Sequence, residues 1–226
     1  MKPRCSNQRN HALTLTEVLV SVVIVCVLAG GAFLMFHRSK VVHRIVPQNR
    51  SSLIQCVNNL KQIGLAFRIW EGDNGDKLPM RVPANQGGAM EPVLRGDVAR
   101  VFQVMSNELS TPRILVCPAD ADRFAAKNFT AGFDNSKVSY FAGLDARDDH
   151  PAMFLAGDDN FAIGGRPVKS GLLLLATNAP VSWTAARHIN QGNIGLADGS
   201  VQITGSSFLR QMLVQTGVAT NRLALP

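Results

Sequence analysis

The amino-terminal part of the chain contains one long apolar stretch preceded by a short basic segment. Residues 13–36 are mostly apolar, and Glu17 is the only charged residue among them. A bilayer is spanned by about 20 apolar residues, whereas the apolar core of a cleaved secretory signal has about 7–15. We therefore predict a transmembrane helix at 13–36. Residues 1–12 contain three basic residues and no acidic one, which favours a cytoplasmic location for that end.

Glu17 is unexpected in such a segment. A charge near the start of a membrane helix costs roughly 2.5–3.5 kcal/mol on insertion scales. An ordinary signal anchor accounts for the other features of this stretch but not for this carboxylate. We therefore expect Glu17 to have a partner.

A second helix is predicted after a short connector. Residues 37–50 are basic and include Pro47, which removes a helical hydrogen bond and bends a helix, so we expect a linker with a kink or break there. From residue 51 to about Trp70, apolar residues recur at spacings of three and four. They are Leu53, Val57, Leu60, Ile63, Phe67 and Trp70. This stripe needs a surface to pack against, and we expect that surface to be a sheet formed by the rest of the chain.

The remainder, within a single domain at 51–226, shows shorter patterns. Helical spacing predicts a short helix at 97–109, and compact apolar runs predict central strands at 114–116 and 171–176. Near the carboxy terminus, strands are predicted at 193–197 and 200–204. The two residues between them, Asp198 and Gly199, predict a type I′ turn, which needs positive φ at both positions.

Composition excludes some functions. The formal net charge is +7, and the mature chain is mildly basic if residues 1–12 are removed. Aromatic residues make up 6% of the chain and are not interleaved with arginines, so no base-stacking platform, and no nucleic-acid partner, is expected.

Neither catalysis nor a metal centre is predicted. A Ser-His-Asp site would need a nucleophile elbow, which the sequence lacks. No paired spacing typical of zinc ligands links the cysteines and the other histidines, which are His11, His37, His43 and His150. We interpret His188 as a packed or hydrogen-bonded residue at a sheet edge. The expectation is a protein that is not an enzyme and has no cofactor.

Four cysteines are distributed over the chain. Cys5 lies in the basic segment, and Cys26 lies in the apolar stretch. Cys56 and Cys117 remain for the exported domain, where an oxidising compartment favours a disulfide between them. Two separate buried thiols are the alternative.

Two acidic groups of residues suit calcium, which prefers six to eight oxygen ligands. Asp145, Asp148 and Asp149 form the first, and residues 158–160 (Asp-Asp-Asn) form the second. Neither matches the spacing of the twelve-residue calcium loop, which argues against calcium. Calcium is therefore kept as an alternative and is not the main prediction.

Residues 12–20, Ala-Leu-Thr-Leu-Thr-Glu-Val-Leu-Val, resemble the processing site of type IV prepilins and type II secretion pseudopilins. The resemblance implies cleavage between Ala12 and Leu13 by prepilin peptidase, followed by methylation of the new amino terminus. It makes Glu17 the fifth residue of the mature chain, which this family uses in filament assembly. Ala12 and Leu13 stand where the family usually has Gly and Phe. Pairing of Glu17 with the free amine of a neighbouring subunit would offset the cost of both charges in lipid.

Three further segments resemble prepilin-like proteins of planctomycete and verrucomicrobial type. Residues 56–66 resemble the opening of their globular domain, and residues 117–120 resemble their Cys-Pro-x-Asp stretch. His188, nine intervening residues and then Asp198-Gly199 resemble their carboxy-terminal signature.

The resemblance implies an α+β, pilin-like fold, in which a long amino-terminal helix packs on an antiparallel sheet. It implies a structural subunit of a type II secretion pseudopilus, with a type IV pilus subunit or a membrane-anchored periplasmic binding module as alternatives. The expected partners are prepilin peptidase, other pilin-like subunits, the inner-membrane assembly platform and membrane lipid. The expected topology is a single pass through the bacterial inner membrane, with the carboxy-terminal domain in the periplasm.

Overall fold

The structure, a computed structural model, describes residues 15–226, with only the backbone described at residue 17 and at 34–49. The predicted basic leader, 1–12, lies outside the described residues. The chain divides into two compact units, Met1–Pro47 and Gln48–Pro226, and each is considered by itself.

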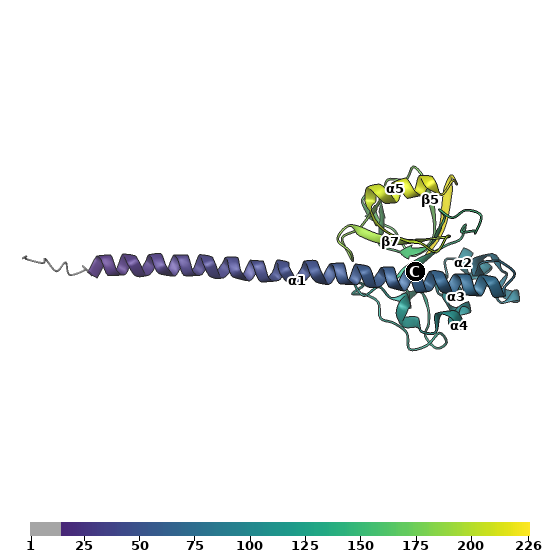
Figure 1. The fold of residues 1–226 in the computed structure, drawn as a ribbon, viewed down its shortest axis with the longest axis horizontal. Helices are drawn as coiled ribbons and strands as arrows, with labels where there is room; N and C mark the ends of the chain where they lie inside the picture. Colours follow the sequence, from purple (N-terminus) through teal and green to yellow (C-terminus); the bar gives the residue numbers. More distant parts are fainter. Residues whose placement is uncertain (1–14) are drawn as a thin grey trace, which may run out of the picture. The chain divides into compact units, whose positions relative to one another are not determined.

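A single helix, α1, covers Leu15–Asp73 (Figure 1). The backbone of the predicted linker, 37–50, is helical through Pro47, so the helix is not broken there. A proline withholds one hydrogen bond, and the other bonds of the neighbouring turns remain available to continue the helix. The boundary between the two units nevertheless falls directly after Pro47.

The transmembrane helix predicted at 13–36 is not confirmed. Within the described part of the chain, no helix has both the length and the apolar character needed to cross a membrane.

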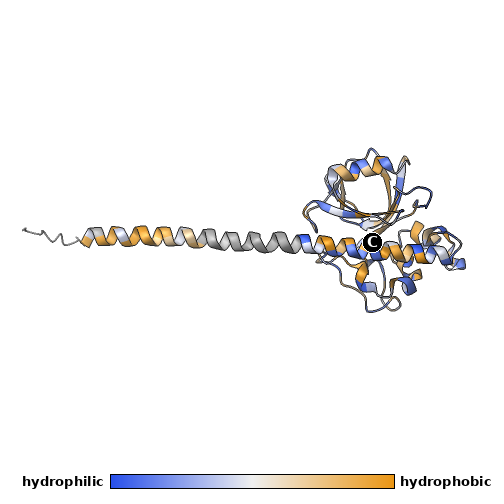
Figure 2. Ribbon diagram, viewed as in Figure 1, coloured by the Kyte–Doolittle hydropathy of each residue, from blue (hydrophilic) through white to orange (hydrophobic). Residues whose placement is uncertain are grey.

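In the second unit, α1 carries the predicted apolar stripe. Leu60, Ile63 and Phe67 are completely or almost completely buried, and Leu65 on the opposite side is exposed. Figure 2 shows that hydrophobic and hydrophilic residues alternate along the last part of α1, whereas its first described turns are mostly hydrophobic.

Short α- and 3-10 helices follow α1 and precede the first strand. They are η1 (Pro79–Arg81), η2 (Ala84–Gln86), α2 (Met90–Leu94), α3 (Val98–Val104), α4 (Ser106–Leu109), η3 (Pro112–Leu115) and η4 (Asn135–Lys137). The helix predicted at 97–109 is therefore present as two pieces, α3 and α4, which meet at Met105. The strand predicted at 114–116 was wrong, because Pro112 starts a 3-10 turn there instead.

Nine strands form two antiparallel sheets in the described chain. The larger has the order β5-β9-β1-β2-β7-β8, and the smaller has the order β4-β3-β6. Their bounds are β1 Tyr140–Gly143, β2 Phe154–Asp158, β3 Phe161–Ile163, β4 Arg166–Pro167, β5 Gly171–Ala176, β6 Val181–Trp183, β7 Gln191–Leu196, β8 Val201–Gly205 and β9 Thr220–Leu225. Helix α5 (Ser206–Gln215) lies between β8 and β9. The predicted α+β fold with a long helix and an antiparallel sheet is confirmed.

Both faces of the larger sheet are covered, so its central strands are buried along their whole length. Tyr140 and Ala142 of β1 belong to the core that contains the buried side of α1. Phe141, between them, points into a second core with residues of β6 and α5. In that second core Phe161 stacks on Trp183 at a centroid distance of 4.7 Å. Because successive side chains of a strand point to opposite faces of the sheet, β1 contributes residues to both cores.

The carboxy-terminal hairpin differs from the prediction in its turn. Strands β7 and β8 pair as far as Gly195 and Val201, so a longer loop joins them. Gly199 has a φ of +85°, but Asp198 does not have the positive φ that a type I′ turn requires. The Asp198 carboxylate instead accepts a hydrogen bond from the backbone N–H of Ser200 at 2.8 Å, which supports a different turn.

Candidate functional site

Four buried side chains from four separate segments meet beside the sheet. Cys56 comes from α1, Cys117 from the segment after η3, Asp158 from the end of β2 and His188 from the loop before β7. One ligating atom of each lies within 4.8 Å of the corresponding atoms of the others. We refer to these four residues as the buried cluster.

The contacts within the buried cluster run from thiol to thiol to imidazole to carboxylate. The sulfur atoms of Cys56 and Cys117 are 2.8 Å apart, and the Cys117 sulfur is 3.2 Å from Nε2 of His188. The same Nε2 is 3.7 Å from Oδ2 of Asp158. Oδ2 also accepts hydrogen bonds from the backbone N–H and the side-chain amide of Asn193, at 2.8 and 2.9 Å.

These contacts shift the acid-base properties of all four groups. The hydrogen bond from the Cys56 thiol lowers the pKa of Cys117 to about 5, with a further contribution from His188, and the pKa of Cys56 is raised correspondingly. Burial raises the pKa of Asp158 to about 7, and the nearby Cys117 adds to the effect. Burial alone would lower the pKa of His188, but Cys117 and Asp158 raise it.

Local backbone features bring the carboxylate and the imidazole together. A Cβ on Gly157 would lie 2.6 Å from the ring of Phe141 and 2.8 Å from the carbonyl oxygen of Asn193. A glycine is therefore needed for β2 and β7 to lie this close, which places Asp158 against Asn193. On the other side, Ile189 and Asn190 have φ values of +49° and +58°, so the chain turns sharply after His188 into β7.

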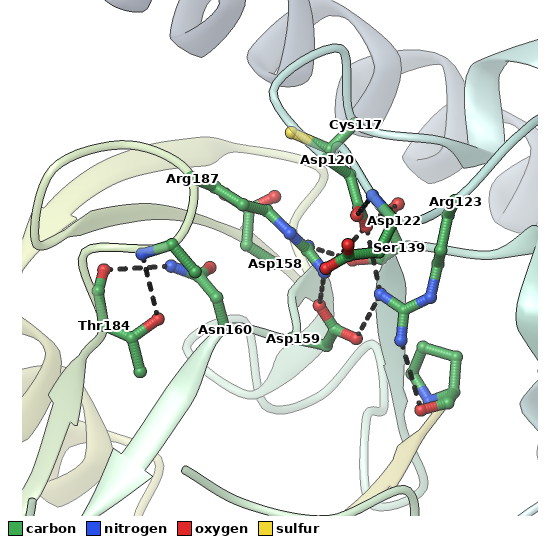
Figure 3. Close-up of polar contacts among 12 residues, drawn as sticks. Cys117, Asp120, Asp122, Arg123, Ser139, Asp158, Asp159, Asn160, Thr184 and Arg187 are labelled. Atoms are coloured by element: carbon green, nitrogen blue, oxygen red, sulfur yellow. Dashed lines mark hydrogen bonds and ion pairs between the residues drawn. The ribbon is translucent and has the colours of Figure 1, made fainter.

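A second set of charged side chains, the ion-pair network of Asp120, Arg123, Asp159 and Arg187, lies next to the buried cluster (Figure 3). Arg187 lies 2.8 Å from a carboxylate oxygen of Asp120 and 2.5 Å from one of Asp159. Arg123 contacts the same two acids at 3.1 and 2.9 Å. Ser139 donates its hydroxyl to Asp120 at 2.7 Å. Each of the two arginines thus pairs with both of the two acids.

Burial and charge oppose each other in this network. Burial alone would raise the pKa of Asp120, but the Arg187 guanidinium, with the Ser139 hydroxyl, holds it below its usual range. For Asp159 burial prevails, and its pKa is raised. The Arg187 guanidinium therefore contacts both carboxylates, but only the pKa of Asp120 ends below its usual range.

The same short segments supply both sets of side chains. Each of three segments contributes one residue to the buried cluster and a nearby one to the ion-pair network. The pairs are Cys117 with Asp120, Asp158 with Asp159, and His188 with Arg187. The two sets therefore form one structural unit.

A cavity of about 720 Å³ opens beside the ion-pair network. Its lining includes all four members of the network, together with Asn160 and Thr184. The buried cluster does not line it, so the two thiols are separated from this space.

The residues predicted to act in processing and assembly fall outside what the structure describes. Ala12 and Leu13 lie before the first described residue, and of Glu17 only the helical backbone is described. Their roles stay predictions.

The other predicted site residues are placed clearly. Cys56 and Cys117 lie side by side as free thiols, so a disulfide between them stays a prediction. His188 is buried in a loop and is not a sheet-edge residue, and Asp198 and Gly199 lie in the hairpin turn without joining it in one site.

The acidic groups considered for calcium are engaged by cationic side chains. Asp145 pairs with Arg222 at 2.6 Å, and Asp148 pairs with Arg68. Asp149 contacts Arg147 at 3.2 Å. Calcium binding stays untested.

The buried cluster as a set was missed by the reasoning from sequence. Zinc-ligand motifs are recognised by short spacings, whereas Cys117 lies 61 positions after Cys56 and His188 lies 71 positions after Cys117. The resemblance to prepilin-like proteins did single out Cys56, Cys117 and His188 within three separate motifs. It gave no indication that these motifs meet, and Asp158 had been considered only for calcium.

Comparison with known proteins locates a recognisable feature at the amino terminus. A model of the prokaryotic N-terminal methylation motif matches residues 7–33. This chain has a prepilin-type amino terminus. No curated protein and no solved structure matches the chain. The motif covers Ala12, Leu13 and Glu17, and it implies processing by prepilin peptidase and pilin-like assembly.

Proposed function

We propose that this prepilin-like chain is a structural subunit of a type II secretion pseudopilus, processed by prepilin peptidase and added to a periplasmic filament. The observation that carries the proposal is the methylation motif at residues 7–33. It includes the proposed cleavage point after Ala12 and the carboxylate of Glu17, five residues into the mature chain.

The described start of α1 supports a role in assembly. Its apolar side chains are exposed on every side of the helix, among them Val18, Leu19, Val23 and Leu28. Such a surface is stable only against lipid or against other apolar helices. This end would contact lipid while the subunit is anchored in the inner membrane. It would contact other apolar helices once the subunit has joined the filament.

The buried cluster and the ion-pair network support a structural role for the domain. A reactive cysteine needs partial exposure, whereas the thiols of Cys56 and Cys117 are fully buried. The carboxylate of Asp158 and the imidazole of His188 are equally inaccessible. We propose that these groups stabilise the fold and do not perform catalysis.

A membrane-anchored binding module is the second candidate, and the cavity of about 720 Å³ beside the ion-pair network favours it. Such a protein would remain dispersed in the membrane, whereas a filament subunit assembles with copies of itself or with related subunits. A measurement of assembly therefore separates the two functions.

The first prediction concerns Glu17. Replacement by alanine removes the charge that we propose to pair with the amine of a neighbouring Leu13, so Glu17→Ala should stay in the membrane fraction and should not enter filaments. Incorporation is measured by crosslinking between neighbouring subunits in cells that express the assembly machinery.

Ser21→Ala is the matched control, because it changes a polar residue one turn further along the same helix. It should assemble normally. Filaments that contain Glu17→Ala at the level of the unaltered chain would contradict the proposed role of this carboxylate.

A further inference from the structure

We propose that the buried cluster of Cys56, Cys117, Asp158 and His188 is a structural zinc site. The site would fasten α1 to the sheet and to the two loops that carry Cys117 and His188.

The donor set matches the chemistry of zinc. Thiolate, imidazole and carboxylate are the three ligand types that Zn²⁺ takes in proteins, usually four at a time in tetrahedral geometry. Here two sulfurs, one ring nitrogen and one carboxylate oxygen lie mutually within 4.8 Å, and all four residues are buried. A closed set of four protein ligands is typical of structural zinc, since catalytic zinc keeps a position open.

Two of the distances between donor atoms already match those of an occupied site. Zinc bond lengths of about 2.0–2.3 Å imply donor-to-donor separations of about 3.2–3.8 Å in a tetrahedron. The Cys117 sulfur lies 3.2 Å from His188 Nε2, and that nitrogen lies 3.7 Å from Asp158 Oδ2. The two sulfurs, now at 2.8 Å, need to separate by about 1 Å, which a small rotation of either cysteine side chain provides.

Charge also favours a cation at this position. Zinc binds the deprotonated forms of its ligands, so two thiolates and the Asp158 carboxylate would place three negative charges around the ion, and buried charges are stable only when they are neutralised. The adjacent ion-pair network has two arginines and two acids, so its charges are matched internally. A Zn²⁺ ion reduces the excess to one negative charge, and the protons it displaces pass to solvent.

The surroundings orient one of the ligands, Asp158, as an outer shell does in known zinc centres. Asn193 fixes Oδ2 of Asp158 by two hydrogen bonds. The second oxygen of Asp158, Oδ1, is buried and has no hydrogen-bond partner among the described residues. Nδ1 of His188 is likewise buried without a hydrogen-bond partner among the described residues, so Asn193 is the outer-shell contact that the structure shows.

A disulfide between Cys56 and Cys117 is the rival arrangement. It would use two of the four converging groups and would leave Asp158 and His188 buried beside an uncharged bridge. The zinc site accounts for all four, so we favour it, and the experiment below separates the two.

The test uses the full chain, purified in detergent with a reducing agent, loaded with zinc chloride and desalted. Elemental analysis should find one zinc per chain, and Cys117→Ser should lose it. Cys26→Ser is the matched control, because Cys26 is exposed and lies outside the buried cluster. It should keep its zinc.

Two further measurements keep the proposal testable if Cys117→Ser does not fold. Asp158→Asn preserves the shape of the side chain and should weaken zinc binding by more than about tenfold in competition with a chelator, since outer-shell changes alone cost about 10–100-fold. Cobalt added in place of zinc should give the charge-transfer absorption of a thiolate ligand.

Three results would overturn the proposal. One is a chain that stays free of zinc after loading. Another is a metal-free chain whose mass, measured without reductant, is lower by roughly 2 Da, which is the signature of the disulfide. The third is zinc retained in full by a folded Cys117→Ser variant.

Discussion

Arg187 is the residue on which the charged interior depends most. Its guanidinium lies between the carboxylates of Asp120 and Asp159, and its second nitrogen donates to the backbone carbonyl of Ser139 at 3.0 Å. Its side chain is only 8% exposed. Two buried acids therefore rely on one buried cation, with Arg123 as a partial substitute.

Replacing Arg187 tests this dependence. Arg187→Met keeps most of the apolar side chain but leaves two buried carboxylates short of one positive charge, so it should lower the free energy of unfolding by about 3–5 kcal/mol. The shift is read from urea unfolding of the full chain in detergent.

Arg222→Met is the matched control. Arg222 pairs with Asp145 at 2.6 Å, but its side chain is 46% exposed, and exposed pairs contribute only about 0–1 kcal/mol. Equal effects of the two substitutions would mean that the ion-pair network is no more important than a surface pair.

At the scale of elements, the last part of α1 contributes one side to the larger hydrophobic core of the domain. Its buried side packs in one core with Tyr140 and Ala142 of β1 and with Phe102 of α3. Phe67, at the centre of that side, lies 6.3 Å from Phe102 between ring centroids. The stability of the helix in this unit therefore comes from packing on one side.

Shortening Phe67 should show this. Phe67→Ala creates a cavity in the core and should cost about 3–5 kcal/mol in the free energy of unfolding. Leu65→Ala, two residues away on the exposed side of α1, should change it by no more than about 0.5 kcal/mol. The midpoint of thermal unfolding followed by circular dichroism gives both values. Similar losses for the two variants would contradict the assigned orientation of α1.

The elements differ in how far sequence alone predicted them. The stripe from Leu53 to Trp70 and the strand at 171–176 were predicted, because an apolar pattern is a local signal. That strand, β5, lies at the edge of the larger sheet and not at its centre as predicted. The continuation of α1 through Pro47 was not predicted, since one missing hydrogen bond says little about the turns on either side. The apolar residues 114–116 looked like a strand, but Pro112 and tertiary packing made them the end of a 3-10 turn and its continuation.

At the scale of the whole molecule, the candidate sites divide into two kinds. The processing region is a short contiguous motif, so it was found from sequence, and the match at residues 7–33 agrees with it. The buried cluster depends on the pairing of β2 with β7 and on the packing of α1, which bring Cys56 to Asp158 and His188. The sequence spacing of these residues does not indicate that their side chains lie together in the fold.

The account as a whole rests on the maturation of the amino terminus. The most direct test is the intact mass and amino-terminal sequence of the chain isolated from membranes after co-expression with prepilin peptidase. We predict a loss of about 1.4 kDa, corresponding to residues 1–12, and a methylated Leu13 at the new terminus. Ala12→Lys should retain the full mass. A chain that keeps its first twelve residues in the presence of active peptidase would contradict the account.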